Sequence, residues 1–251
     1  MTCRANTICL FDVDGTLTQP RQKAQNETLD FLLKKLKPLS HLAIVSGSDM
    51  NKVAEQLGGE KVLEQFDFVF PENGLVAYKN GKLFEKKSII DHMGEDKIQT
   101  FINYCLQHLS TVTLPFKRGN FIEFRTGLIN VSPVGRSCTQ AERDAFEKYD
   151  KEHKVRQALI DKLNRDLPDI GLTYSIGGQI SFDAFPKGFD KTYCLKYLDQ
   201  DFANRIHFFG DKTSPGGNDY EIYNDNRTHG HSVTSPQHTI ETLSQLFDIK
   251  E

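Results

Sequence analysis

Two aspartates separated by one residue follow an apolar run near the start of the chain, in the segment Phe11-Asp12-Val13-Asp14-Gly15. Ligands of open α/β sheets bind beyond the carboxyl ends of the strands, which is where Asp12 would lie. Asp14 is two residues further on and can point to the same side. Such a pair suits phosphoryl transfer, in which one ionised carboxylate attacks phosphorus and the other, protonated, supplies a proton to the departing oxygen.

A carboxylate that faces a phosphate dianion needs a cation to neutralise the site. The segment therefore predicts Mg²⁺ with oxygen ligands. Taken alone, Asp-x-Asp-Gly also fits an ordinary acidic turn.

Further segments would bring suitable residues to the same sheet edge. Asp211 follows a second apolar strand, and Ser46 and Ser48 follow a third, where they offer hydroxyl or backbone N–H donors to phosphate. Lys191 can supply a fixed positive charge, and the loop 215–219 adds oxygen ligands on a backbone freed by glycines. This combination favours phosphoryl transfer over an acidic turn.

The elements that would position these residues alternate between strand and helix. This alternation is typical of a doubly wound, Rossmann-like α/β sheet. Apolar periodicity predicts strands over 7–11, 42–45, 66–70, 205–209 and 231–233, and helices over 26–36, 49–57, 193–198 and 236–247.

The middle of the chain has a different pattern, because its strands are not separated by regular crossover helices. An Asn-Gly hairpin is expected over 78–83. We expect strands over 121–125, 129–131 and 173–185, and helices over 96–109, 139–149 and 155–163. The predicted architecture is an α/β core of residues 1–84 and 188–251, interrupted by an α+β cap domain over 85–187 with an antiparallel sheet.

Composition limits the kinds of partner and the cellular compartment that this chemistry can involve. The 251 residues carry a formal net charge of -3, which gives no support to nucleic-acid binding. The apolar stretch at the N-terminus is too short for a secretory signal, and no run is long enough to span a membrane. Five cysteines without a CxxC pair indicate reduced thiols rather than a disulfide scaffold or zinc site. We therefore expect a cytoplasmic protein.

Arginines are the second chemical signal, with Arg125, Arg136 and Arg143 in the cap and Arg21 just after the first motif. Scattered arginines are usually solvated surface. Arg143, however, follows a sequence with the form of a capping box, so it falls in the first turn of a helix, where a cation opposes the macrodipole. Pairing with a neighbouring acid would explain this, and so would a functional demand.

Ser181 and Asp183 alternate with apolar residues in the expected strand over 173–185. A sheet could use such a face to hydrogen-bond sugar hydroxyls, although any half-exposed strand has the same pattern.

The first set of motifs resembles the haloacid dehalogenase superfamily of phosphotransferases, through DVDGT, IVSGS, Lys191 and GD…GGND. The resemblance implies that Asp12 forms an aspartyl phosphate and that Asp14 is the acid–base residue. It also implies that Asp12, the Asp14 backbone carbonyl and Asp211 hold Mg²⁺. It leaves open whether Ser46 or Ser48 binds phosphate.

A narrower resemblance covers nearly the whole chain. The segments PENGLVAY, FIEFR, NVSPVGR, SIGGQISFD and GDKT are similar to those of the eukaryotic phosphomannomutase family. The family implies interconversion of mannose 6-phosphate and mannose 1-phosphate, with a hexose 1,6-bisphosphate as activator. It further implies supply of GDP-mannose synthesis and a homodimer formed through the cap.

The same resemblance assigns roles to individual residues. Arg125, Arg136 and Arg143 would hold the distal phosphate with Arg21, Ser181 and Asp183 would bind the sugar or its phosphate, and Tyr223, Asp225 and Thr228 would form a second cation site. Ser46 stands where the family has Gly, and Lys187 and Phe189 replace commoner Asp and Trp. These departures concern substrate preference, because none removes a charged catalytic group.

A mutase needs two phosphate sites, because its bisphosphate intermediate must turn over between transfers. It must also exclude water, which a closing cap achieves, with hinges expected near 83–86 and 187–188. The alternatives are a sugar-phosphate phosphatase of the same superfamily, which passes the phosphoryl group to water, and a non-catalytic phosphosugar sensor.

Overall fold

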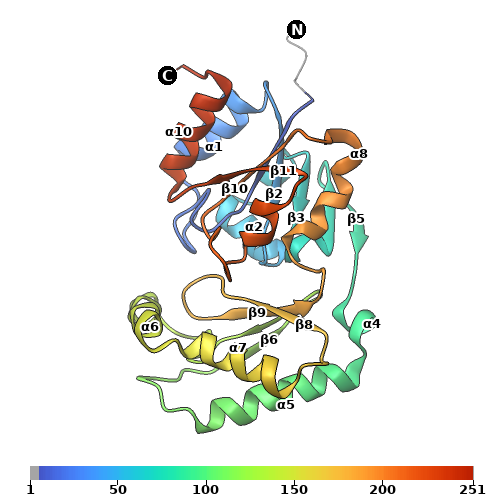
Figure 1. Ribbon diagram of the computed structural model, residues 1–251. Helices are drawn as coiled ribbons and strands as arrows, with labels where there is room; N and C mark the ends of the chain where they lie inside the picture. Colours follow the sequence, from blue (N-terminus) through green and yellow to red (C-terminus); the bar gives the residue numbers. More distant parts are fainter. Residues whose placement is uncertain (1–5, 251) are drawn as a thin grey trace. The chain divides into compact units, whose positions relative to one another are not determined.

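The structure is a computed structural model that describes residues 6–250 (Figure 1). It divides into two compact units, a core that runs up to Lys86 and resumes at Gly188, and a cap from Lys87 to Lys187. The first crossing lies two residues beyond the expected end at 84, because strand β5 (Lys82–Lys86) still pairs at Lys86, opposite Val76.

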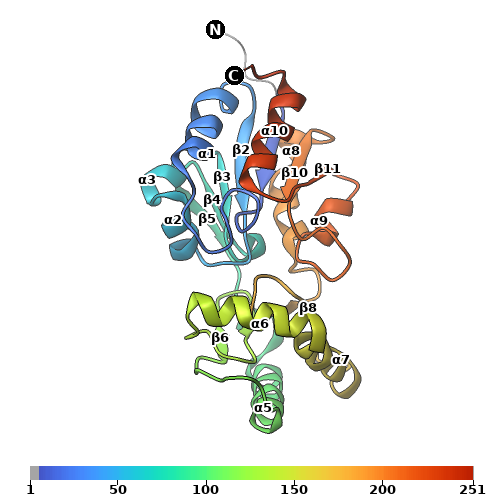
Figure 2. The same cartoon turned by 90° about the vertical axis from the view of Figure 1, so that its left-hand side faces the viewer.

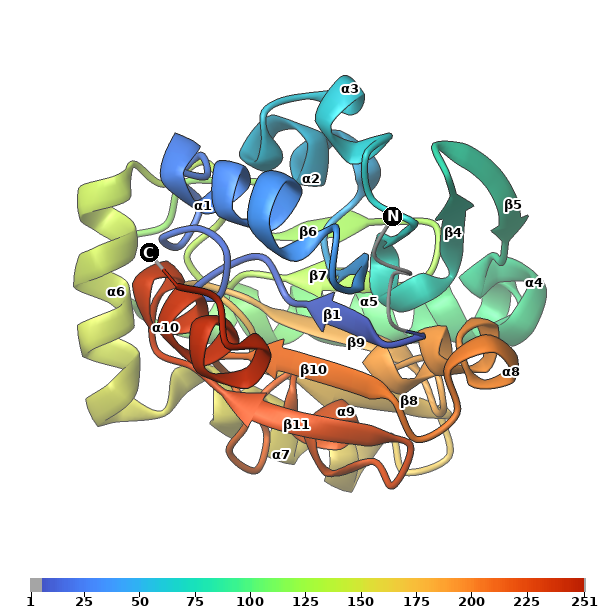
Figure 3. The ribbon, with the colours of Figure 1, turned by 90° about the horizontal axis from the view of Figure 1, so that it is seen from above.

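The core unit is built on one seven-stranded sheet of order β11-β10-β1-β2-β3-β4-β5. The first five strands in this order pair in parallel, whereas β3-β4 and β4-β5 are antiparallel. Figure 3 shows β1, β10 and β11 side by side. The strands are β1 (Ile8–Phe11), β2 (His41–Val45), β3 (Phe68–Phe70), β4 (Val76–Lys79), β5 (Lys82–Lys86), β10 (Ile206–Gly210) and β11 (Thr228–Ser232).

Both faces of this sheet are covered, which is why its central strands are apolar throughout. Along β1, Cys9 and Phe11 pack in one cluster with helices α1, α2 and α10, whereas Ile8 and Leu10 pack in another with η3 and α8. Figure 2 shows α1, α2 and α3 on one side of the sheet and α8 and α9 on the other. The helical segments are α1 (Asn26–Asp30), η1 (Phe31–Leu36), α2 (Met50–Leu57), α3 (Glu60–Leu63), η2 (Glu72–Gly74), η3 (Lys191–Tyr197), α8 (Asp199–Phe202), α9 (Tyr220–Asn224) and α10 (Pro236–Phe247).

The cap unit has a four-stranded antiparallel sheet of order β6-β7-β9-β8. Its main apolar cluster joins this sheet to helices α5 and α7. The fold class predicted from the sequence, a doubly wound core with an inserted α+β cap, is therefore confirmed. The cap elements are β6 (Ile122–Phe124), β7 (Ile129–Val131), β8 (Leu172–Ser175), β9 (Phe182–Pro186), α4 (Ile89–Met93), α5 (Glu95–Thr111), α6 (Gln140–His153) and α7 (Val155–Asp166).

Two local predictions were wrong. The expected strand over 173–185 is two strands, β8 and β9, because residues between them turn at Gly178, whose φ of 62° suits glycine. Ser181 therefore lies just before β9 rather than inside a strand. The last strand begins at Thr228, three residues before the expected start, since Thr228–Ser232 pairs along the whole length of β10.

Four cysteines, Cys9, Cys105, Cys138 and Cys194, are free and buried, whereas Cys3 lies outside the described residues. Within residues 6–250, the structure contains no helix with the length and apolar character needed to cross a membrane.

Candidate active site

Asp12 stands directly after β1 and is 4% exposed. Its backbone N–H donates to the carbonyl of Phe209 at 2.9 Å, which ties the residue to the neighbouring strand β10. Parallel pairing of β1 with β10 therefore brings Asp12 and Asp211 to the same edge of the sheet. Asp12 thus lies at the end of a buried strand, where the sequence predicted it.

Lys191 neutralises part of this buried acidic group. Its Nζ lies 2.5 Å from Asp12 Oδ1 and 2.6 Å from Asp219 Oδ1, and the side chain is 1% exposed. Burial disfavours the ammonium, but the charges of Asp12 and Asp219 outweigh it and raise the pKa of Lys191. Lys191 is thus a permanent cation next to the candidate nucleophile.

Three carboxylates converge here, from Asp12, Asp211 and Asp219, with one oxygen of each within 4.8 Å of the others. Burial raises the pKa of Asp12 well above its ordinary value, and the charges of Asp219 and Asp211 add to this against the opposing effect of Lys191. Burial likewise raises the pKa of Asp211, although Lys212 opposes the shift at 2.9 Å. One buried lysine does not balance three carboxylates, so the donor set fits a hard divalent cation such as Mg²⁺.

Two glycines let the carboxylates approach the backbone. A Cβ on Gly15, whose φ is 85°, would lie 2.5 Å from an Asp211 oxygen. A Cβ on Gly210 would lie 2.7 Å from the Asp219 carboxylate. Side chains at these positions would displace the acidic group, so both glycines are part of the site.

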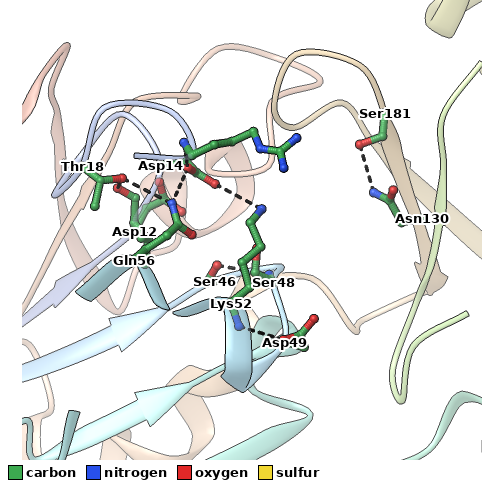
Figure 4. A network of polar contacts seen from close by, with 12 residues as sticks. Asp12, Asp14, Thr18, Ser46, Ser48, Asp49, Lys52, Gln56, Asn130 and Ser181 are labelled. Carbon is green, nitrogen blue, oxygen red and sulfur yellow. Dashed lines mark hydrogen bonds and ion pairs between the residues drawn. The ribbon is translucent and has the colours of Figure 1, made fainter. Parts of the chain in front are cut away.

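Asp14 is held in a more open position by groups from elsewhere in the core. Its Oδ1 accepts from Gln56 Nε2 at 2.8 Å, as Figure 4 shows, and also from the backbone N–H of Arg21 at 2.6 Å. Lys52 Nζ lies 3.9 Å from Oδ2. The Asp14 side chain is 30% exposed, so a bound ligand can reach it while these contacts hold its orientation.

Ser46 and Ser48 lie at the end of β2, both buried. Ser46 Oγ accepts from the backbone N–H of Ser48 at 3.1 Å (Figure 4). Asp49 then caps α2 by accepting from the backbone N–H of Lys52 at 2.9 Å. Phosphate binding by Ser46 or by Ser48 stays a prediction.

In the cap, one glutamate links two of the predicted arginines. Glu123 accepts from Arg125 Nε at 2.6 Å and from Arg136 Nε at 2.5 Å through its two oxygens. Arg136 also donates to Asn130 Oδ1 at 2.6 Å. These arginines are therefore ordered by an acidic partner rather than dispersed over solvated surface.

Arg143 is 5% exposed, and its place in the first turn of a helix has a local explanation. The capping box of Thr139 and Glu142 is present. The Arg143 guanidinium turns back from α6 and donates to the backbone carbonyls of Cys138, at 3.0 Å, and Arg136. Arg143 thus fastens the loop that carries Arg136.

Ser181 and Asp183 both contact Asn130, whose Nδ2 donates to Ser181 Oγ at 3.0 Å, as in Figure 4, and to Asp183 Oδ1 at 2.7 Å. Arg156, in a buried pair with Asp150 at 2.7 Å, donates to the carbonyl of Ser181 at 3.0 Å. The cap therefore assembles a continuous polar network on β7, β9 and the turn before β9.

The residues predicted for a second cation site lie between the last turn of α9, which holds Tyr223, and the first residue of β11, Thr228. Thr228 Oγ1 donates to the carbonyls of Ile222 and Asp225, at 2.6 and 3.1 Å. The Asp225 carboxylate is paired with Arg227 at 2.7 Å, which lowers its pKa. A cation bound at Tyr223, Asp225 and Thr228 would have to compete with Arg227 or use backbone oxygens.

Several residues of these networks were not singled out from the sequence: Gln56, Lys52, Glu123, Asn130 and Arg156. Lys52 and Gln56 are four residues apart on α2, so they share a helix face, a signal that could have been used. Asp219 was expected only as part of a ligand loop, although it is fully buried and closest to Lys191 after Asp12. No periodic signal points to Glu123.

Comparison with known proteins agrees with this geometry. Residues 29–249 match the family model described as eukaryotic phosphomannomutase. The chain is 52% identical to a phosphomannomutase of Drosophila melanogaster over 98% of this chain and 97% of that protein. It is 54% identical to phosphomannomutase 1 of Mus musculus, covering 96% and 92%.

Solved structures support the fold independently of sequence. A sugar phosphatase of subclass IIB of the HAD superfamily superposes with a TM-score of 0.64 at 13% identity, covering 96% of this chain and 98% of that one. An IMP-nucleotidase of Plasmodium falciparum gives 0.67 at 17% identity, covering 97% and 68%.

Proposed function

Because this chain belongs to the eukaryotic phosphomannomutase family, we propose that it interconverts mannose 6-phosphate and mannose 1-phosphate by carrying a phosphoryl group on Asp12. The observation that carries the role of Asp12 is its position. It is a buried carboxylate at a strand end, 2.5 Å from a permanent lysine cation and grouped with two further carboxylates.

Asp12 is the nucleophile in this proposal. One of its oxygens forms a bond to phosphorus of a hexose 1,6-bisphosphate, and the bond from phosphorus to the sugar oxygen breaks. Asp14 gives its proton to that departing oxygen. In the return step Asp14 removes the proton of the accepting hydroxyl, which takes the phosphoryl group from Asp12. A hexose 1,6-bisphosphate is thereby both activator and intermediate.

The remaining core residues support these two carboxylates. Lys191 offsets charge that gathers on Asp12, whereas Gln56 and the Arg21 N–H orient Asp14. Asp12, the Asp14 carbonyl and Asp211 would hold Mg²⁺, which when bound would neutralise the phosphate that Asp12 approaches. Ser46 or Ser48 is proposed to bind the transferred phosphate.

The cap network is proposed as the site for the phosphate that is not reacting. Arg125, Arg136 and Arg143, with Arg21, would bind it, and Ser181 and Asp183 would bind the sugar or its phosphate. Support comes from the order of this network, since a guanidinium recognises phosphate best when its fork is already positioned. We place the second cation at Tyr223, Asp225 and Thr228.

The test is a product assay with mannose 1-phosphate and a trace of hexose 1,6-bisphosphate. A mutase forms hexose 6-phosphate, whereas a sugar-phosphate phosphatase releases stoichiometric inorganic phosphate and would refute the proposal. A parallel assay with glucose 1-phosphate reports the substrate preference. A non-catalytic sensor would give neither product.

We also propose where the product of this reaction is used in the cell. Mannose 1-phosphate would supply GDP-mannose synthesis in the cytoplasm, consistent with four free cysteines in the described residues.

A homodimer through the cap is proposed because Ile90, Leu106 and Phe124 are 43%, 48% and 44% exposed there. Sedimentation of the full chain tests this, and a monomer at micromolar concentration would contradict it.

A further inference from the structure

Three histidines gather at the edge of the core sheet, apart from the acidic site. His207 is on β10, and His229 and His231 are on the edge strand β11, with His207 opposite His229 in the parallel register. Residues i and i+2 of a strand point to one face, so His229 and His231 share a face. Both lie against His207, with ring centroids 5.0 and 5.3 Å from its own.

Two of the imidazoles already face each other through nitrogen atoms. His207 Nδ1 lies 3.0 Å from His231 Nε2. Two imidazole nitrogens bound to one tetrahedral Zn²⁺, each at ~2.0–2.1 Å, lie roughly 3.3 Å apart. The pair is therefore near the separation of two metal ligands, and a metal could replace the hydrogen bond once the donor ring moves its proton to its other nitrogen.

Aromatic side chains fix this pair in place. His231 stacks on Phe209 with centroids 4.6 Å apart, and His207 meets the edge of Phe247 at 6.4 Å. Burial, reinforced by His231 and His229, lowers the pKa of His207 to about 4. At neutral pH His207 is thus the neutral imidazole, the form that binds metal ions.

His229 is the exposed member of the group. Its Nε2 lies 3.0 Å from the carbonyl oxygen of Asn204. In this conformation the three rings do not place one nitrogen each within 4.8 Å of the others, so His229 must turn to join the pair. An exposed side chain at the sheet edge can turn without repacking the core.

We propose that His207, His229 and His231 form a binding site for a divalent transition-metal ion of the zinc class, with water as the remaining ligand. Imidazole nitrogen favours zinc, copper or nickel, whereas Mg²⁺ takes oxygen ligands, so the site is chemically distinct from the carboxylates of Asp12 and Asp211. The ion would clamp β11 onto β10, the strand that leads to Asp211.

Cobalt is the probe for this site, because a four-coordinate imidazole complex of Co²⁺ absorbs visible light more strongly than an octahedral complex with oxygen ligands. The full chain is titrated with Co²⁺ in excess Mg²⁺, which occupies the acidic site. We expect one equivalent to bind with intense visible bands, and Zn²⁺ to displace it. Zn²⁺ should also raise the midpoint of thermal unfolding by several degrees when it is well above its Kd.

Variants separate the ligands from their surroundings. His231→Phe keeps the stack on Phe209, and His207→Gln keeps a polar side chain. Each should weaken Co²⁺ binding by more than ~100-fold, because even the loss of an outer partner of a metal ligand costs 10–100-fold. His229→Ala should weaken it about 10-fold, and the matched control His92→Gln, exposed in the cap, should leave it unchanged.

Equal Co²⁺ affinity in the wild type and in His231→Phe would overturn the site. So would cobalt bands that survive in both pair variants and disappear in Asp211→Asn, because the ion would then be in the acidic group. Unchanged affinity in His229→Ala would overturn the three-histidine assignment. Circular dichroism of each variant shows whether the fold is retained.

Discussion

The two units of this protein each hold a cluster of opposite charges, but they expose those charges differently. In the core, the side chains of Asp12, Lys191 and Asp219 are 6%, 1% and 0% exposed. In the cap, Arg136 and Glu123 are 17% and 32% exposed, whereas Arg125 is 7% exposed. Water can therefore replace a lost partner of Arg136 or Glu123 and has little access to the core cluster.

This difference in exposure suits the core cluster to the chemical step and the cap cluster to substrate binding. Buried charges must be matched at all times, because desolvation costs several kcal/mol per ion. The core group therefore has a permanent cation in Lys191 and a carboxylate set suited to a metal. The cap arginines can exchange partners, since Glu123 orders Arg125 and Arg136 and a phosphate can then compete for them. Core substitutions should abolish turnover, whereas cap substitutions should mainly weaken substrate recognition.

The largest effect is expected for Asp12→Asn, which removes the proposed nucleophile. Turnover of mannose 1-phosphate should fall by at least ~10⁴-fold, since loss of a nucleophile removes the covalent route. The control is Asp30→Asn, which breaks an exposed pair with Lys34 and should leave turnover unchanged. Substantial residual turnover with retained Mg²⁺ binding would show that another group accepts the phosphoryl.

A smaller and different effect is expected for Arg136→Gln in the cap. kcat/KM should fall roughly 10²-fold, mostly through a higher KM, because the lost fork binds phosphate in ground and transition states alike. Arg118→Gln is the matched control, since Arg118 is a cap arginine that is 46% exposed and pairs with Glu142 on α6 at 2.6 Å. A fall confined to kcat would contradict a binding role.

Sequence reasoning succeeded where a residue type is tied to a strand end. Asp12 and Asp211 were placed correctly because buried strands have a clear apolar pattern and the carboxyl edge of a parallel sheet is one place. The helix expected over 49–57 also agrees with α2 to within one residue, since its ends are set locally by Asp49 as N-cap and Gly58 as C-cap.

The side-chain contacts of the cap could not be predicted from the sequence in the same way. Glu123 accepts from Arg125 and Arg136 because β6 pairs with β7 and a loop returns, a tertiary result without local signal. The Thr173–Phe185 error has a similar cause, because alternation continued through Gly178 and concealed the turn. Arg143 was noticed for breaking a helix rule, but its carbonyl partners could be found only in the fold.

Arg143→His is the next prediction, and the contacts of Arg143 with backbone carbonyls set the expected loss of stability. Two buried carbonyls would lose their donor, so the free energy of unfolding should fall by about 1–3 kcal/mol in urea titrations. Turnover should fall as well, because the loop carrying Arg136 loosens. Arg165→His, at an exposed arginine, is the control; unchanged stability in Arg143→His would contradict the loop role.

The smallest effect concerns protons and metal in the core. Asp12 and Asp211 have pKa values raised in the folded protein, so the metal-free fold binds their protons more tightly than the unfolded chain. The free energy of unfolding therefore decreases as pH rises from the ordinary carboxyl pKa through these raised values. His207 acts oppositely, since its pKa is lowered to about 4 and its protonation destabilises the fold as pH falls below its ordinary value.

The Mg²⁺-dependent part of stability separates these two contributions, because Mg²⁺ takes oxygen ligands such as these carboxylates and not the imidazole of His207. We expect Mg²⁺ to add about 1–3 kcal/mol near pH 8, at concentrations of ~10–100 times its Kd, and clearly less near pH 5, where protons compete for the same oxygens. Urea unfolding with and without Mg²⁺ at both pH values measures this increment. Asp211→Asn should flatten its pH dependence. An equal increment at both pH values would mean that Mg²⁺ binds groups other than the buried carboxylates, and the contrast between a charge-matched core and an exchangeable cap would lose its electrostatic basis.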